Sequence, residues 1–351
     1  MDGMANQVGR LSPAALRGAL RIPRPPGVRL QRGIAIATVV VQAAIAVTGS
    51  VVRVTGSGLG CPSWPGCFED SWVPDARAEV AWLHQWVEFG NRLMTGVVGI
   101  VALACLAVML LAEPRRRRVI ALAAAMPAGV ALQGIVGGLT VIVGLAWWSV
   151  SIHLLLSMAL VWLAVLLVRA VGEGDEPARP VIAAAPRRLL VVAVALLPAL
   201  LFAGTLVTAA GPHAGDADTP RLAVDIELLA KVHAGVLYAF LAALAATGVA
   251  LWRTGRSATR PALWRTDRSG SGDRTVWRRY GVLLAVVLAQ GTLGLVQYWT
   301  GVPEVLVSLH VLGAASVVVA TAALWVSTRE RGSPPGPPPS PPVAVAARAA
   351  S

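Results

Sequence analysis

Long apolar stretches recur along the chain and are separated by shorter polar segments. Windows of about 20 apolar residues predict eight membrane-spanning helices, at residues 33–54, 86–111, 119–143, 147–170, 188–210, 227–252, 279–299 and 304–327. The apolar residues run continuously instead of alternating, which disfavours a membrane β-barrel. The pattern therefore predicts an all-α membrane protein.

Composition and charge support a bilayer environment. The 351 residues are 56% hydrophobic and 14% charged, with a mean hydropathy of +0.67. The net charge of +12 does not indicate nucleic-acid binding, because the arginines gather in alternate connections between helices. These connections are the N-terminal arm, the stretches 115–118, 169–188 and 253–279, and the tail. The other connections are acidic, so the positive-inside rule places both termini in the cytoplasm.

An internal repeat organises the predicted helices. An offset of 157 residues aligns Gln133-Gly134 with Gln290-Gly291, and Ser151-x-His153 with Ser308-x-His310, while Gly49 aligns with Gly204 at a slightly different offset. Four spans separate equivalent positions, so the repeat is parallel. We expect two tandem pseudo-symmetric four-helix bundles. The expected parts are a basic arm 1–32, an N-terminal half 33–171, a linker 172–187, a C-terminal half 188–328 and a disordered Pro-rich tail 329–351.

The histidines carry the candidate chemistry. Four of the five lie in or at predicted helices, where an ionisable group is costly and indicates function. His233 and His310 each lie about 6 residues, or ~9 Å, from the outer end of a helix. Equal depth in one bundle is what bis-imidazole ligation of a heme iron needs, and the sequence holds no Cys-x-x-Cys-His motif for covalent attachment. We therefore predict a b-type heme, and zinc, which needs more ligands, is a weak alternative.

The N-terminal half departs from this symmetry. His153 matches His310, but the position that matches His233 is Asn91, and the spacing places His84, Glu88 and Asn91 on one helix face. This asymmetry favours a cofactor heme in the C-terminal half and a reacting substrate in the N-terminal half. Glu88 is either a catalytic carboxylate or the partner of a salt bridge to Arg92 or His84.

The cysteines and His213 are not among the candidate heme ligands. Cys61 and Cys67 fall in a Pro- and Gly-rich loop expected to face an oxidising compartment, which favours a disulfide, either a structural one or one that exchanges during turnover. Cys105 is expected to be an inert buried residue. His213 lies in an outer loop, where solvation is favoured over capping of the cofactor site.

Several of these motifs resemble the heme A synthase family. They are the Arg53-Val-Thr-Gly-Ser-Gly-Leu-Gly-Cys61 stretch, the Glu88-Phe-x-Asn91-Arg92 stretch, the duplicated Gln-Gly hairpins and the pair His233 and His310. The resemblance covers about residues 35–327. It implies two fused four-helix bundles in the plasma or inner mitochondrial membrane. The implied activity oxidises the ring methyl of heme O to formyl, which gives heme A for cytochrome c oxidase assembly, with heme b as cofactor.

The resemblance also implies residue roles. His233 and His310 would ligate the iron of heme b, His153 would ligate the iron of the substrate heme, and Glu88 would be the catalytic carboxylate. Asn91 stands where many members of the family have a second histidine, so the sixth ligand is either His84 or absent. Arg53 and Arg92 are candidates to pair with heme propionates, the alternative being that they snorkel to the interface.

The expected partners follow from the same resemblance. They are heme O, a heme O synthase, terminal oxidase assembly factors and the lipid bilayer, with no nucleic acid, and a homo-oligomer is compatible with the sequence. The main alternative function is a di-heme b electron-transfer protein that oxidises quinol without changing the heme. A heme exporter or insertion factor is a further alternative, and it would need no Glu88.

Overall fold

The computed structural model describes residues 25–77, 80–257 and 269–334, together with the isolated positions 12, 15 and 18. Eight of its helices are long and apolar enough to cross a membrane. In chain order they are α3 (Val28–Val54), α4 (Trp82–Leu111), α5 (Arg117–Ile142), α6 (Trp147–Val171), α7 (Ala184–Ala210), α8 (Ile226–Ser257), α9 (Ser269–Trp299) and α10 (Glu304–Ser327). The all-α membrane fold expected from the apolar runs is confirmed.

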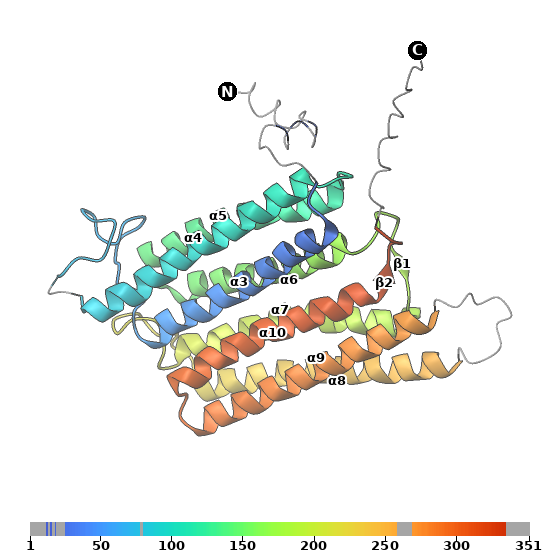
Figure 1. The fold of residues 1–351 in the computed structure, drawn as a ribbon. Helices are drawn as coiled ribbons and strands as arrows, with labels where there is room; N and C mark the ends of the chain where they lie inside the picture. Colours follow the sequence, from blue (N-terminus) through green and yellow to red (C-terminus); the bar gives the residue numbers. More distant parts are fainter. Residues whose placement is uncertain are drawn as a thin grey trace, which may run out of the picture.

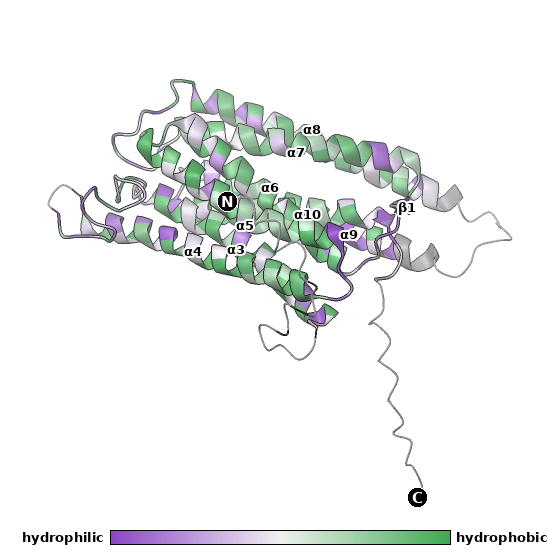
Figure 2. Cartoon of the chain, turned by 90° about the horizontal axis from the view of Figure 1, so that it is seen from above, coloured by the Kyte–Doolittle hydropathy of each residue, from purple (hydrophilic) through white to green (hydrophobic). Residues whose placement is uncertain are grey.

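The helices run side by side, so that the described connections lie at two opposite ends of the molecule (Figure 1). One end carries residues 55–81, which include both loop cysteines, and we call it the disulfide end. The other carries the arginine-rich connection 112–116 and residues 172–183, and we call it the arginine end. Apolar residues dominate the middle of the helices and hydrophilic residues gather toward the ends (Figure 2). This distribution is the one that a bilayer imposes on a bundle of helices.

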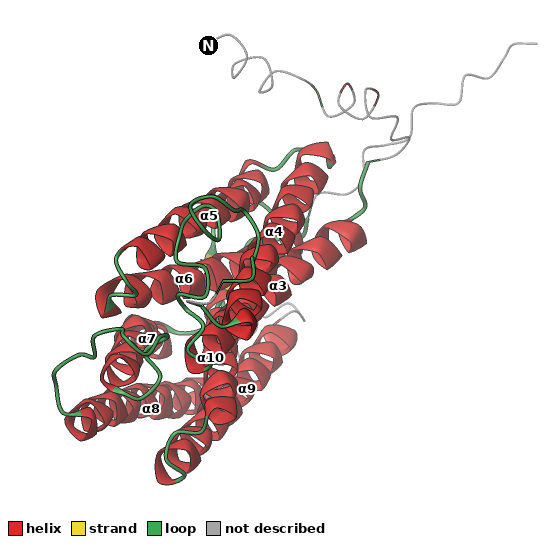
Figure 3. Ribbon diagram, turned by 90° about the vertical axis from the view of Figure 1, so that its left-hand side faces the viewer, coloured by secondary structure: helices red, strands yellow, loops and turns green. Residues whose placement is uncertain are grey.

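The helices of the two chain halves, α3–α6 and α7–α10, make different sets of contacts. The helices α3, α4, α5 and α6 pack around a ring, while α7 packs along α8 and α9 packs along α10. Viewed from the disulfide end, the two groups lie next to each other (Figure 3). They meet where α10 contacts α3 and α6, and where α6 contacts α7. One apolar core, around Met109 and Met126, lies among α3–α6, while the other, around Phe240 and Leu283, also includes Met158 and Val161 of α6.

Ion pairs tie the arginine end together. Glu173, which is 4% exposed, accepts from Arg118 on α5 at 2.6 Å and from Arg169 on α6 at 2.9 Å. Arg116 binds Asp175 at 2.7 Å, and this hydrogen bond lowers the pKa of the Asp175 carboxyl. The two guanidinium groups compensate the negative charge of the buried Glu173 carboxylate.

Several boundaries differ from the sequence-based expectation. The helix expected to begin at 33 begins at Val28, and the one expected at 279 begins at Ser269, because polar first turns carry no apolar signal. The expected disordered tail from 329 is wrong at its start. Residues Arg329–Glu330 form strand β2, which pairs antiparallel with β1 (Arg179–Pro180). The rest of the tail, from 335 on, lies outside the described residues.

Candidate heme sites at the disulfide end

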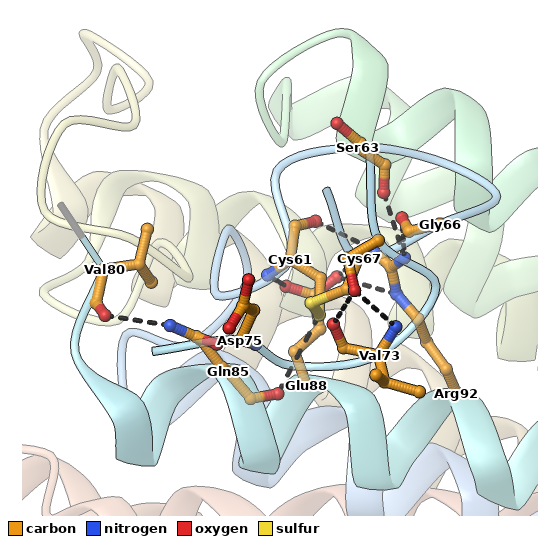
Figure 4. The surroundings of a disulfide bond; sticks show 11 residues. Cys61, Ser63, Gly66, Cys67, Val73, Asp75, Val80, Gln85, Glu88 and Arg92 are labelled. Carbon is orange, nitrogen blue, oxygen red and sulfur yellow. Dashed lines mark hydrogen bonds and ion pairs between the residues drawn. A yellow bond between two sulfur atoms is a disulfide. The ribbon is translucent and has the colours of Figure 1, made fainter. Parts of the chain in front are cut away.

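The loop after α3 is closed by a disulfide. Cys61 and Cys67 are bonded to each other, and both are fully buried (Figure 4). The predicted disulfide is thus present in the structure. Cys105 is a buried free cysteine toward the C-terminal end of α4, and its burial was expected.

Glu88 lies below this loop, on the second turn of α4. Its side chain is 6% exposed, and Oε1 accepts from Arg92 Nη2 at 2.5 Å. Its other oxygen, Oε2, accepts the backbone N–H of Cys61 at 2.7 Å. The salt bridge to Arg92 that the helix spacing allowed is therefore formed, and Glu88 also holds the backbone of the disulfide loop. Both carboxylate oxygens therefore have partners although the group is buried.

Arg92 fastens the same loop from one turn further along α4. Its Nε and Nη2 donate to Glu88, and its remaining donors reach three carbonyl oxygens, those of Ser63, Gly66 and Cys61, at 2.7 to 3.0 Å. A guanidinium has five N–H donors, and these five hydrogen bonds use all of them. The expectation that Arg92 pairs with a heme propionate is therefore not supported, because no donor remains for it.

The two histidines of the C-terminal half lie on α8 and α10. A Cβ built on Gly204 of α7 would lie 3.1 Å from Cε1 of His233, and one built on Gly294 of α9 would lie 3.1 Å from Cε1 of His310. Each imidazole therefore packs against a glycine of a neighbouring helix. The Nδ1 atoms of both rings are buried without a hydrogen-bond partner. Buried, unpaired imidazole nitrogens are ready to bind a ligand or a metal.

The N-terminal half repeats one of these arrangements. His153 on α6 lies 3.2 Å from the position of a Cβ on Gly137 of α5, and its Nδ1 is likewise buried and unpaired. Gln133 Nε2 donates to the His153 carbonyl at 3.0 Å, and Gln290 Nε2 donates to the His310 carbonyl at 2.8 Å. The repeat seen in the sequence thus corresponds to a repeated set of contacts. The alignment of the two halves did not show that these glycines contact the imidazoles.

Asn91 and His84 lie at different levels of α4. Asn91 faces Gly49 of α3, and its Oδ1 accepts from Thr48 Oγ1 at 2.7 Å. His84 lies in the first turn of α4, where its Nδ1 is 3.0 Å from the carbonyl oxygen of Gly56. The two side chains are two helical turns apart, or ~10.5 Å along the axis. His84 thus belongs to the base of the disulfide loop.

Arg53 and His213 connect the two groups of helices. Arg53 Nε donates to the carbonyl of His213 at 2.7 Å, and Gly58 N donates to the carbonyl of Gly215, also at 2.7 Å. His213 Nε2 lies 2.9 Å from the carbonyl oxygen of Val302, in the connection between α9 and α10. The expectation that His213 is merely solvated is therefore wrong. The sequence did not reveal this contact, because the partner of His213 is a backbone carbonyl distant in sequence. A backbone carbonyl leaves no motif in the sequence.

The side chains present fit a heme better than a lone metal ion. Among the described residues, no three His, Cys, Asp or Glu side chains group together as ligands. A b-type heme needs only two axial imidazoles, because the porphyrin supplies the other four ligands. His233 and His310 meet that requirement, with an orphaned nitrogen on each and a glycine beside each ring.

Comparison with known proteins identifies the family. The model of a family described as cytochrome oxidase assembly protein matches residues 32–322. The chain belongs to this family. The match begins four residues into α3 and ends five residues before the end of α10, so it covers all eight helices. The candidate sites therefore lie wholly within the matched region.

Curated relatives of the family are named heme A synthase. The one from Shewanella oneidensis is 28% identical over 142 residues, which is 37% of this chain and 42% of that protein. The one from Symbiobacterium thermophilum is 28% identical over 158 residues, 44% of this chain and 50% of that protein. A third, from Geobacillus kaustophilus, is 37% identical over 73 residues, 21% of each chain. The aligned segments span at most about half the length of these relatives. They support the heme A synthase family and give no support to the di-heme quinol-oxidising alternative.

Proposed function

We propose that this protein is a heme A synthase, which oxidises the ring methyl of heme O to a formyl group and so supplies heme A for terminal oxidase assembly. The observation that carries the proposal is the difference between the two halves. One half offers two inward imidazoles, His233 and His310, while the other offers one imidazole and a buried carboxylate, His153 and Glu88. A protein that only carries electrons has no need of this difference.

The C-terminal half is proposed to hold the cofactor. His233 and His310 would hold the iron of heme b, and the adjacent Gly204 and Gly294 leave room for their rings. When bound, such a heme supplies one-electron transfer at a potential set by its ligands and surroundings. The protein's part is to fix the two imidazoles and to exclude water, which the packing of the rings against the glycines supports. At the disulfide end of this half, Arg53 and His213 link the connections between helices through their hydrogen bonds to backbone carbonyls.

The N-terminal half is proposed to bind heme O. His153 would ligate the substrate iron from α6, and the Gln133 bond to the His153 carbonyl fixes that turn of the helix. Glu88 lies one turn from Asn91, toward the disulfide end, and would balance developing positive charge or accept a proton at the reacting methyl. Its salt bridge to Arg92 holds the carboxylate in place. Arg53, whose Nε is bound to His213, remains the candidate for a propionate.

The setting of the site is proposed from the charge pattern. The arginine end would face the cytoplasm, with both termini, and the disulfide end would face the outside of a plasma membrane. The disulfide fits an oxidising outer compartment. A heme O synthase that delivers the substrate and assembly factors that receive heme A are the partners this activity requires, and self-association is compatible with it.

Expression in a bacterial host that makes heme O but lacks its own heme A synthase tests the proposal. Membranes containing the protein should yield heme A, recognised by the pyridine spectrum of a formyl-bearing heme. Membranes containing His153→Ala should yield heme O but no heme A. The quinol-oxidising alternative predicts the opposite pattern: quinol oxidation that depends on the two C-terminal histidines, with heme O unchanged.

A further inference from the structure

Four equivalent positions in the bundle share one arrangement, in which a side chain faces a glycine on a neighbouring helix. The pairs are His153 with Gly137, His233 with Gly204, His310 with Gly294, and Asn91 with Gly49. In the first three the imidazole carbon is 3.1 to 3.2 Å from the position of a Cβ on the glycine, and in the fourth Asn91 Nδ2 is 4.0 Å from it. Asn91 therefore occupies the fourth ligand position, where the C-terminal half has His233.

The orientation of Asn91 is fixed by a residue that only this half has. Thr48 Oγ1 donates to Asn91 Oδ1 at 2.7 Å, so the amide NH₂ is the end directed toward Gly49. The residue equivalent to Thr48, just before Gly204, is Ala203, which is buried and has no polar side chain. The hydroxyl is thus present where the facing residue is an amide and absent where it is an imidazole. An amide whose carbonyl is already occupied presents its N–H donors to the site.

His84 does not take the place of the missing imidazole. It is ~10.5 Å from Asn91 along α4, beyond the reach of an imidazole toward an iron held at the level of position 91. Its Nδ1 lies against the Gly56 carbonyl, and Gly60 packs so closely on the His84 carbonyl that no Cβ would fit, so the loop backbone rests directly on this turn. Movement of His84 toward the bundle centre would require the disulfide loop to detach.

We infer that the substrate heme in this protein has a single protein ligand, His153, and that its open coordination position faces the Asn91 amide and binds a small exogenous ligand such as water or a diatomic gas. The inference rests on the proposed function, because it assumes that heme O occupies the N-terminal half. Heme iron in proteins is ligated by imidazole, thiolate, thioether or phenolate, and a carboxamide is not among these groups. A hydrogen-bond donor beside an open position decides how such a ligand is held.

Carbon monoxide is the probe for this inference, because it binds a ferrous heme with an open position and not one with two tight imidazoles. The purified protein, loaded with heme b and heme O and reduced, should bind about one carbon monoxide per two hemes. Asn91→His should convert the second heme to a low-spin form and abolish carbon monoxide binding. The matched change in the other half, His233→Asn, should make the heme b site reactive as well. Thr48→Val should shift the carbon–oxygen stretching frequency without changing the stoichiometry.

The outcomes separate this inference from the proposed function. If the loaded parent protein holds heme O but binds no carbon monoxide, and His84→Ala then makes it reactive, His84 is the second ligand and the inference is wrong. Unchanged carbon monoxide binding in Asn91→His would also contradict it, since an imidazole at that position should occupy the iron. If the parent retains no heme O at all, or if His153→Ala retains it equally well, the proposed function itself fails.

Discussion

Arg92→Ala tests whether the disulfide loop is held by the guanidinium. The substitution removes all five hydrogen bonds that Arg92 makes to Glu88 and to the carbonyls of Cys61, Ser63 and Gly66. It also leaves the Glu88 carboxylate, 6% exposed, without its counter-charge. Removal of one partner of a buried ion pair costs about 3–5 kcal/mol. Since the Arg92 side chain is 20% exposed, we expect the lower value, about 3 kcal/mol.

That cost should appear as easier local opening of the loop. About 3 kcal/mol corresponds to roughly a hundredfold change in an equilibrium constant, so the disulfide of Arg92→Ala should be reduced by a water-soluble phosphine about 100 times faster than in the parent. The rate is measured by quenched alkylation and peptide mass spectrometry, which distinguishes Cys61 and Cys67 from the buried Cys105.

A matched control lies on the same loop. Arg77 binds Asp70 at 2.5 Å, but the two side chains are 29% and 71% exposed, and such a surface pair is worth about 0–1 kcal/mol. Arg77→Ala should therefore change the reduction rate by less than about fivefold. The double variant Arg92→Ala with Glu88→Gln should be less labile than Arg92→Ala alone, because it leaves no buried charge unpaired. If Arg92→Ala is reduced within about threefold of the parent rate, the guanidinium does not hold the loop.

Three further predictions concern the sites and the topology. Glu88→Gln should keep heme b and lower heme A formation by about 10²–10⁴-fold, the usual range for loss of an acid–base group, and a rate within about threefold of the parent would mean that Glu88 serves only the salt bridge. His233→Ala and His310→Ala should each abolish the low-spin heme b spectrum, and its persistence in both would show that other ligands hold the cofactor. In intact cells an impermeant thiol reagent should label Asp218→Cys at the disulfide end and not Ala178→Cys at the arginine end, whereas the reverse result would invert the proposed orientation.

The helices were predictable from the sequence because each apolar run is long enough to cross a bilayer. A run of this length favours a membrane helix over other structures. The disulfide was predictable because the two cysteines lie close together in a turn-rich loop. The role of Arg92 was not, because its acceptors beyond Glu88 are backbone carbonyls whose positions depend on the folded loop. The same holds for His213 and Val302, whose contact spans 89 residues.

The internal repeat also separates what the sequence predicts from what only the structure shows. Alignment of the halves identified Asn91 as the position equivalent to His233, and that required only spacing. The hydrogen bond from Thr48 required the packing of α3 against α4, which no periodicity specifies. The chemistry of the N-terminal half therefore depends on a side-chain pair that became apparent only in the structure.

The heme content of the purified protein tests the central claim most directly. The protein is expressed with heme O available, its hemes are extracted, and each is identified by mass and by its reduced pyridine spectrum. The proposed function predicts heme b together with heme O and its formyl product, with the formyl product absent from Glu88→Gln and from His153→Ala. Recovery of heme b alone, or of heme O that is never converted, would contradict the assignment as a heme A synthase.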